Sequence, residues 1–248
     1  MPIPEETANG TDQPNVPRRV AAIFAHPDDA EFICAGTVAK WAAEGQHVTY
    51  VLMTSGDKGS DDPSMTSEQL VTMREGEQRA ACKVLGVQDV IFLRHPDAML
   101  QNTLELRKEL VRVIRTIKPD AVITFDPTVR YVGGQYINHP DHRVTGDVTL
   151  DAIYPAARDR LTFHELITEE GLEPHKVSEV YLTGLDQADF WVDITDYFDL
   201  KLEALKAHTS QINVEEVGEW VREWATEAAA NLNPGGKYAE GYRYFKLD

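Results

Sequence analysis

The sequence predicts an α/β fold in which a Rossmann-like, mostly parallel sheet carries helices on both faces. From Arg19 onward, short β-branched or apolar runs alternate with amphipathic stretches, a pattern typical of strand–helix–strand units. No repeats or low-complexity segments interrupt this alternation. A chain of 248 residues is long enough for one sizeable core. We therefore expect residues 18–248 to form a single domain.

The apolar runs and the amphipathic stretches locate the elements in order. We expect strands near 19–25, 47–54, 89–94, 120–125 and 178–184, with a further strand at 189–194. We expect helices near 30–44, 67–85, 103–117, 141–157, 196–211 and 215–231. Gly45 and Gly86 follow the first two helices as C-terminal caps, and Pro119 follows the third. The segment Thr66 to Gln69 has the spacing of a capping box before the second helix.

The ends and the composition of the chain exclude several classes of protein. Residues 1–17 are rich in Pro, Glu, Asn and Thr without an apolar centre, so we expect a disordered leader and not a secretory signal. No apolar run is long enough to cross a bilayer, so we expect a cytoplasmic protein without membrane insertion. The formal charge of −17 would repel a phosphate backbone, which makes nucleic acid a poor partner. Cys34 and Cys82 fall in predicted helices without metal or redox spacing, and we expect both in the core.

The first predicted strand ends in the motif His26-Pro27-Asp28-Asp29. In open α/β sheets the ligand crevice lies beyond the carboxyl ends of the strands, so this turn belongs to the region where a site is expected. One aspartate could simply cap the following helix. A second carboxylate in the same turn carries a like-charge cost unless a cation is present. The segment therefore favours a metal or catalytic role.

A complementary motif, His139-Pro140-Asp141-His142, follows the strand at 120–125 and a polar loop. Histidines three apart at a helix start can face one point, where the positive potential favours the neutral, ligating imidazole. Two imidazoles and one carboxylate leave an open position that suits a catalytic Zn²⁺ with an activated water. The remaining aspartate of the first motif and the third histidine then have the right chemistry for base and acid. The spacing alone does not decide which of the two aspartates would bind the metal.

Four segments carry a resemblance to a known family: AHPDDAEF at 25–32, REGE at 74–77, HPDH at 139–142 and KLEALKAHTSQ at 201–211. With them the sequence resembles the PIG-L or LmbE-like superfamily of zinc-dependent N-acetylglucosaminyl deacetylases. The resemblance implies the LmbE-like three-layer α/β/α fold and an amino-sugar substrate. Relatives commonly assemble, so it also implies that a homo-oligomer can form.

The resemblance implies a role for each residue of the two motifs. His26, Asp29 and His142 would bind zinc, and Asp28 would be the general base. His139 would stabilise the oxyanion and protonate the leaving amine, oriented by Asp141.

The sequence departs from one pattern of the family. Mycothiol-type members place a tyrosine two residues before the first histidine of the second motif, whereas this sequence has Ile137 there and Tyr136 one residue further back.

Charges on predicted core faces offer two further sets of candidates. Arg74 and Glu77 fall on or beside the apolar stripe of the second helix, which indicates either a buried Arg–Glu pair or an Arg74 that reaches substrate. The resemblance supports a substrate-binding role for Arg74 and for Asp97, which follows the third strand. Lys201 and His208 also point inward, and we interpret them as a satisfied polar cluster under the site, braced by neighbours. For the polar segment 56–64 a solvated loop is favoured over a lid.

The leading hypothesis is a metal-dependent N-deacetylase that uses activated water on an N-acetylglucosamine-type sugar or conjugate. One alternative is an amidase that acts on a related amino-sugar conjugate. Two histidines and one carboxylate also describe non-haem Fe(II) oxygenases, so Fe²⁺ is the second metal considered. A third alternative is a relative that binds metal without turnover.

Overall fold

The structure is a computed structural model that describes residues 18–132, 134, 136–183, 187–232 and 235–248. The predicted disordered leader, residues 1–17, lies outside the described residues. Among the described helices none is both long and apolar enough to cross a membrane.

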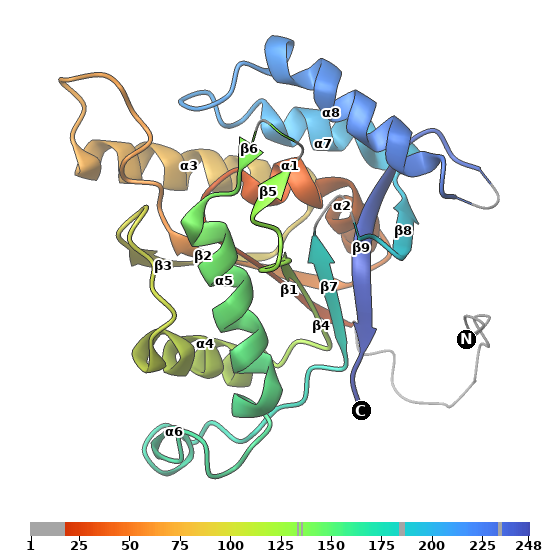
Figure 1. Cartoon of the computed structure of the whole chain (residues 1–248). Helices are drawn as coiled ribbons and strands as arrows, with labels where there is room; N and C mark the ends of the chain where they lie inside the picture. The colour runs from red at the N-terminus through yellow and green to blue at the C-terminus, as the bar shows by residue number, and fades with distance from the viewer. Residues whose placement is uncertain (1–17, 133, 135, 184–186, 233–234) are drawn as a thin grey trace.

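A seven-stranded sheet forms the centre of the molecule, with the strand order β3-β2-β1-β4-β7-β9-β8 (Figure 1). Its strands are β1 (Arg19–Phe24), β2 (His47–Thr54), β3 (Asp89–His95), β4 (Ala121–Phe125), β7 (Glu179–Thr183), β8 (Phe190–Asp193) and β9 (Ala239–Lys246). The first five of these in spatial order pair in parallel. Only β9 runs antiparallel to its neighbours, β7 and β8. The mostly parallel sheet that the sequence predicts is therefore confirmed.

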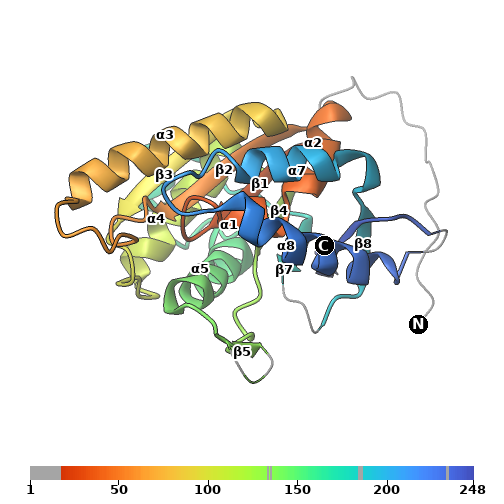
Figure 2. The same ribbon diagram turned by 90° about the horizontal axis from the view of Figure 1, so that it is seen from above.

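Helices cover both faces of the sheet, as Figure 2 shows from above. One face carries α1 (Asp29–Ile33), α2 (Ala35–Ala43), α3 (Ser67–Leu85), α7 (Phe198–Leu205) and α8 (Val214–Ala229). The other face carries α4 (Leu104–Ile117) and α5 (Pro140–Asp151), and α6 (Glu165–Thr168) follows on the same side. Alternate residues of β1 enter two separate hydrophobic clusters, Phe24 with Phe198 on one side and Ile23 with Ile114 on the other. This arrangement confirms three layers.

The predicted helix ends are largely present. Gly45 and Gly86 have φ values of 87° and 75°, a left-handed conformation that glycine adopts without strain. Thr66 and Gln69 form the predicted capping box at the start of α3. The third predicted helix ends at Ile117, and its C-cap Lys118 directly precedes Pro119.

Several boundaries differ from the prediction for local reasons. The helix expected at 30–44 is two helices, because the backbone of Cys34 leaves the helical region at φ −133°; the cysteine is buried at this junction and not inside a helix. The helix expected at 141–157 continues beyond α5 only as a π-helical turn, Ala152–Ala156. The helix expected at 196–211 is shorter, since a 3-10 turn precedes α7 and the chain unwinds after Leu205.

Three strands were not predicted. The longest is β9, whose sequence AEGYRYFK begins with Ala, Glu and Gly, residue types that are depleted in strands. The other two are β5 (Tyr131–Val132) and β6 (Tyr136–Ile137), an antiparallel pair that precedes α5. Tyr136 and Ile137 are exposed in this pair.

Candidate metal and catalytic site

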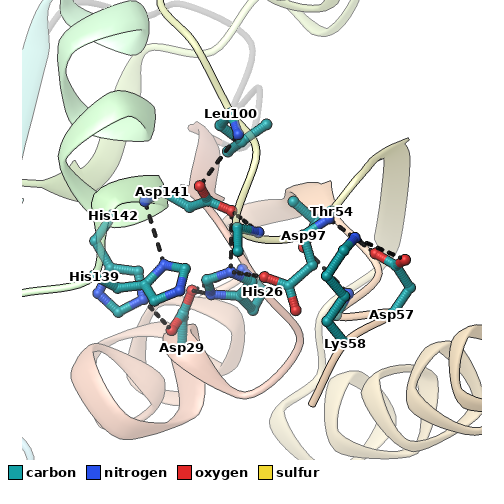
Figure 3. A network of polar contacts seen from close by, with 12 residues as sticks. His26, Asp29, Thr54, Asp57, Lys58, Asp97, Leu100, His139, Asp141 and His142 are labelled. Carbon is teal, nitrogen blue, oxygen red and sulfur yellow. Dashed lines mark hydrogen bonds and ion pairs between the residues drawn. The ribbon is translucent and has the colours of Figure 1, made fainter. Parts of the chain in front are cut away.

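The two histidine motifs meet at the carboxyl edge of the sheet, where β1 and β4 end (Figure 3). His26 follows β1, and His139 and His142 lie at the start of α5. Figure 3 shows these three side chains together with Asp29, Asp97 and Asp141. The sequence-predicted residues therefore come from three strand–helix connections, after β1, β3 and β4.

The turn after β1 is bent so that its two aspartates point differently. Asp28 has φ 92°, a left-handed conformation in which a non-glycine residue is strained. Asp29 begins α1 and accepts a hydrogen bond from the His26 amide over 2.7 Å. Arg74 donates to the Pro27 carbonyl over 2.8 Å. The strained turn is therefore held at both ends.

The start of α5 is shaped by its N-cap. His139 occupies this position, and its Nδ1 accepts a hydrogen bond from the Asp141 amide over 3.2 Å. The fully buried Asp141 carboxylate accepts from the amides of Ala98 and Leu100, over 2.7 and 3.2 Å. Asp141 thus contacts His139 through its backbone, while its carboxylate binds the loop after β3.

The proposed ligands converge on the Asp29 carboxylate. Its Oδ2 lies 3.3 Å from Nδ1 of His26, and its Oδ1 lies 3.1 Å from Nε2 of His142. On the other edge of His26, Nε2 lies 3.1 Å from Oδ1 of Asp97 and 3.5 Å from Oδ2 of Asp141. The Asp29 carboxylate therefore contacts both predicted histidine ligands, each through a different oxygen. Among the described residues, the groups whose ligand atoms all lie within 4.8 Å of one another contain His26 and His142 but not Asp29.

The donor atoms suit a metal ion. Two overlapping groups, His26/His139/His142 and His26/Asp97/Asp141, each place their ligand atoms within 4.8 Å of one another. Among the described residues, the buried Nε2 of His26 has no aligned hydrogen-bond partner, although Asp97 lies at ion-pair distance. Imidazole and carboxylate together are the donors that Zn²⁺ and Fe²⁺ accept. The cluster is thus a candidate metal site.

The electrostatics of the cluster favour positive charge. Burial alone would lower the pKa of His26, but the Asp29 carboxylate, with Asp141 and Asp97, raises it to about 12. Burial alone would raise the pKa of Asp97, but its contact with His26 lowers it to about 2. His142 and His26 likewise hold the pKa of Asp29 below its usual range against the effect of burial. In contrast, burial and the neighbouring rings of His26 and His142 lower the pKa of His139.

The Asp28 carboxylate contacts Arg74. Nη2 of Arg74 lies 3.2 Å from Oδ2 of Asp28, and Nη1 donates to the Gly56 carbonyl over 3.0 Å. Burial, together with the Asp29 charge, raises the pKa of Asp28 to about 7 against the opposing effect of Arg74. Glu77 instead accepts from Thr209 and from Ser210. The Arg74–Glu77 pair considered from the sequence is therefore wrong.

Two amide side chains support the site and were not foreseen. Gln78 accepts a hydrogen bond from the Asp28 amide over 3.1 Å, and Asn138 faces Nδ1 of His142 at 3.0 Å. Gln78 stands four residues after Arg74 on the same face of α3, and Asn138 directly precedes the second motif. These spacings are the only signals that could have indicated either residue.

The loop that begins at Gly56 is tied down at its start. A Cβ on Gly56 would lie 2.1 Å from Nη1 of Arg74, so the close approach of the guanidinium requires glycine here. Gln211 donates to the Gly59 carbonyl over 3.0 Å. Residues 58–64 are exposed. The favoured interpretation as a solvated loop agrees with this exposure.

The inward-pointing charges of the α7 region form the predicted polar cluster. Nζ of Lys201 lies 2.6 Å from Oε1 of Glu240 and donates to the Phe32 carbonyl over 2.7 Å. Nε2 of His208 lies 3.3 Å from Oε2 of Glu31, without an aligned hydrogen bond. The Lys201 ammonium therefore has hydrogen-bond partners, whereas His208 has only an ion-pair contact with Glu31.

Comparison with known proteins gives consistent similarities. The family model for GlcNAc-PI de-N-acetylase, PIG-L, matches residues 21–153, a range that contains both histidine motifs. The chain is 33% identical to diacetylchitobiose deacetylase of Thermococcus kodakarensis, over 92% of this chain and 83% of that protein. It is 31% identical to 1D-myo-inositol 2-acetamido-2-deoxy-alpha-D-glucopyranoside deacetylase of Actinosynnema mirum, over 82% of this chain and 83% of that protein. The solved structure of N,N'-diacetylchitobiose deacetylase from Pyrococcus horikoshii superimposes with a TM-score of 0.84 at 30% identity, over 92% of this chain and 84% of that one.

Proposed function

Because the chain belongs to the GlcNAc-PI de-N-acetylase (PIG-L) family, we propose that it is a zinc-dependent hydrolase that removes the N-acetyl group from an N-acetylglucosamine-type sugar or conjugate. The main observation in support of this proposal is the position of the Asp29 carboxylate, which lies within 3.3 Å of one ring nitrogen of His26 and one of His142. Relatives named for deacetylation of a chitobiose and of a glucosaminyl inositol support the amino-sugar class.

His26, Asp29 and His142 would hold the ion, with the rings and the carboxylate as its ligands. A zinc ion bound there supplies a Lewis acid and lowers the pKa of a coordinated water to about 7. Burial of His26 and Asp29 limits competition from bulk water.

Asp28 would accept the proton of the attacking water. Its carboxylate is adjacent in sequence to the proposed ligand Asp29 and is held by Arg74 at 3.2 Å. The Gln78 contact to its amide fixes the strained turn.

His139 would stabilise the oxyanion and deliver a proton to the leaving amine. Its Nδ1 accepts from the Asp141 amide, so a neutral ring carries its proton on Nε2. Water attack on the acetyl carbon followed by cleavage of the C–N bond then gives acetate and a primary amine.

Arg74 and Asp97 are the proposed substrate residues. Asp97 stands on the loop after β3 beside His26, where a carboxylate can accept hydrogen bonds from sugar hydroxyls. Nε of Arg74 is buried without a partner among the described residues, although both terminal nitrogens are bonded. Arg74 would therefore act on the substrate mainly through its contact with Asp28.

A deacetylation screen tests the proposal. Zinc-loaded protein is incubated with N-acetylglucosamine, diacetylchitobiose and N-acetylglucosaminyl conjugates of inositol and malate, and acetate and primary amine are measured. We expect both products in equal amounts from at least one substrate. Stoichiometric zinc with no amine from any of them would favour a metal-binding relative without turnover. Oxygen consumption by an iron-loaded sample would favour the oxygenase.

Replacement of Asp28 by Asn tests the proposed base. General-base catalysis contributes roughly 10²- to 10⁴-fold, so we expect a loss of turnover of that size. Zinc content, measured by elemental analysis, should stay at the wild-type level because Asp28 is not a proposed ligand. Full turnover in this variant would remove Asp28 from the mechanism.

A further inference from the structure

We propose that Asn138 is a positioning residue that keeps the proton of His142 on Nδ1 and so presents Nε2 to the metal. This inference rests on the proposed function, since it assumes that His142 is a ligand.

The orientation of the Asn138 side chain is determined by a second contact. Its Nδ2 donates to the Val129 carbonyl over 2.7 Å, and a carbonyl can only accept. The amide oxygen must therefore be the atom that faces His142. The backbone of Asn138 is also held, because its amide donates to the Arg130 carbonyl over 2.9 Å and its carbonyl accepts from Arg143.

This orientation sets the tautomer of His142. Oδ1 of Asn138 lies 3.0 Å from Nδ1 of His142 and can only accept, so Nδ1 carries the proton. In a neutral ring Nε2 then has a free lone pair. It lies 3.1 Å from Oδ1 of Asp29, which also has only lone pairs. Two lone pairs at this separation repel each other unless a proton or a metal ion lies between them, so with a neutral ring both groups are free to bind a metal ion.

The plane of the His142 ring is held as well. Phe125, the last residue of β4, stacks on the imidazole with centroids 4.2 Å apart and planes 11° apart. Asn138 at the edge and Phe125 on the face together leave one orientation of the ring. His26 differs, since its second nitrogen has no aligned hydrogen bond among the described residues. Of the two proposed histidine ligands, His142 is therefore the one whose second ring nitrogen has an aligned partner, and that partner is Asn138.

Zinc affinity measures this role without relying on turnover. The dissociation constant is obtained by competition with a chromophoric chelator for wild type, Asn138→Leu and Asn138→Asp. Loss of an outer-shell partner of a metal ligand typically weakens binding roughly 10- to 100-fold, and we expect this increase for Asn138→Leu. Asn138→Asp keeps an acceptor at Nδ1 but loses the donation to the Val129 carbonyl, so we expect its zinc affinity to lie between those of wild type and Asn138→Leu. Asn213→Ala removes an amide that caps α8 and serves as the structural control, with unchanged zinc affinity.

The outcomes separate the two proposals. A wild type that does not bind zinc would overturn the proposed function and this inference with it. Tight binding by wild type and equally tight binding by Asn138→Leu would overturn the inference alone.

A spectroscopic measurement decides the matter if Asn138→Leu does not fold. Wild-type protein with ¹⁵N-labelled histidine reports the protonated ring nitrogen, and the His142 signals are assigned by their absence in His142→Gln. We expect the proton on Nδ1 with and without zinc. A proton on Nε2 of the neutral ring in the metal-free protein would refute the positioning role.

Discussion

Two buried groups of histidine and carboxylate side chains each contain one residue of α1 and differ in how their charge is balanced. The strand-end cluster consists of His26, Asp29, Asp97, Asp141 and His142. The α7 cluster consists of Glu31, Lys201, His208 and Glu240. Within the described part of the chain, every ion pair of the strand-end cluster involves a histidine, whereas the α7 cluster contains a lysine of its own.

In the α7 cluster, the buried carboxylate of Glu240 is fully balanced by partners within the protein. The Glu240 carboxylate pairs with Lys201 and accepts hydrogen bonds from the Gly36 and Thr37 amides, over 3.0 and 2.7 Å. These amides belong to the first turn of α2, where they have no partner within the helix. A strand-borne glutamate thus caps a helix and is neutralised by a lysine. Among the described residues the strand-end cluster pairs its carboxylates with histidines and contains no lysine, and this difference supports the proposal that it binds a metal ion.

The largest effect is expected where the strand-end cluster loses its shared carboxylate. In Asp29→Asn the amide oxygen can still accept from the His26 amide, so the fold should persist, but the charge between the two histidines is gone. We expect zinc content and acetate release both to fall to background. Elemental analysis and circular dichroism measure the two effects.

The matched control is Asp147→Asn, an exposed position on α5, which should keep zinc and turnover. If Asp29→Asn retains stoichiometric zinc, the proposed ligand set is wrong.

The next largest effect is expected in the α7 cluster and concerns stability. Lys201→Met leaves Glu240 buried without its cation, which costs about 3–5 kcal/mol in the free energy of unfolding. The double variant Lys201→Met/Glu240→Gln removes the charge as well and should lose less. Urea unfolding measures both.

Lys206→Met is the control, because this lysine is exposed in a pair with Glu203 that contributes about 0–1 kcal/mol. A loss for Lys201→Met no larger than that of the control would show that Glu240 does not depend on the lysine.

The smallest effect is expected at an ion pair with one exposed partner, Glu75 with Arg94. Arg94 donates to both carboxylate oxygens over 2.7 and 2.9 Å, and this contact lowers the pKa of Glu75 below its ordinary 4.5. A lowered folded-state pKa gives stability that is present above pH 4.5 and is lost as the pH falls through the folded value. Since the Arg94 side chain is 63% exposed, Glu75→Gln should cost only about 0–1 kcal/mol at neutral pH.

Urea unfolding of wild type and Glu75→Gln at neutral and acidic pH checks this expectation. The difference between the two proteins should disappear at the acidic pH. A constant difference across the range would mean that the charge of Glu75 is not the stabilising feature.

The regular elements could be predicted because their signals are local. Alternating apolar runs located β1 to β4 and β7, and capping residues located the ends of α3 and the glycine after it. β9 could not be found in this way, because its buried Glu240 is tolerable only beside Lys201, which is 39 residues away. The break at Cys34 left only a weak sequence signal, since the nearby Gly36 disfavours a helix by about 1 kcal/mol and does not by itself end one.

The sequence could predict that the two histidine motifs lie close together, but not which side chains contact one another there. Parallel strands end at one edge of a sheet, so two histidine motifs after β1 and β4 had to lie near each other. The partners of Arg74 were not accessible, because the backbone carbonyls of Pro27 and Gly56 carry no residue-specific signal. Gln78 and Asn138 were missed for a related reason, since single amides occur throughout any sequence.

By itself, the sequence determined the alternation of strands and helices, the two histidine motifs at strand ends and the inward direction of Lys201 and His208. Each of these follows from residue type and spacing within one element or its adjacent turn. Only the tertiary structure decided that Asp29 stands between two histidines, that Arg74 holds Asp28 and that Asn138 faces Nδ1 of His142. Such contacts depend on packing distances between segments far apart in the chain, and no local periodicity encodes them.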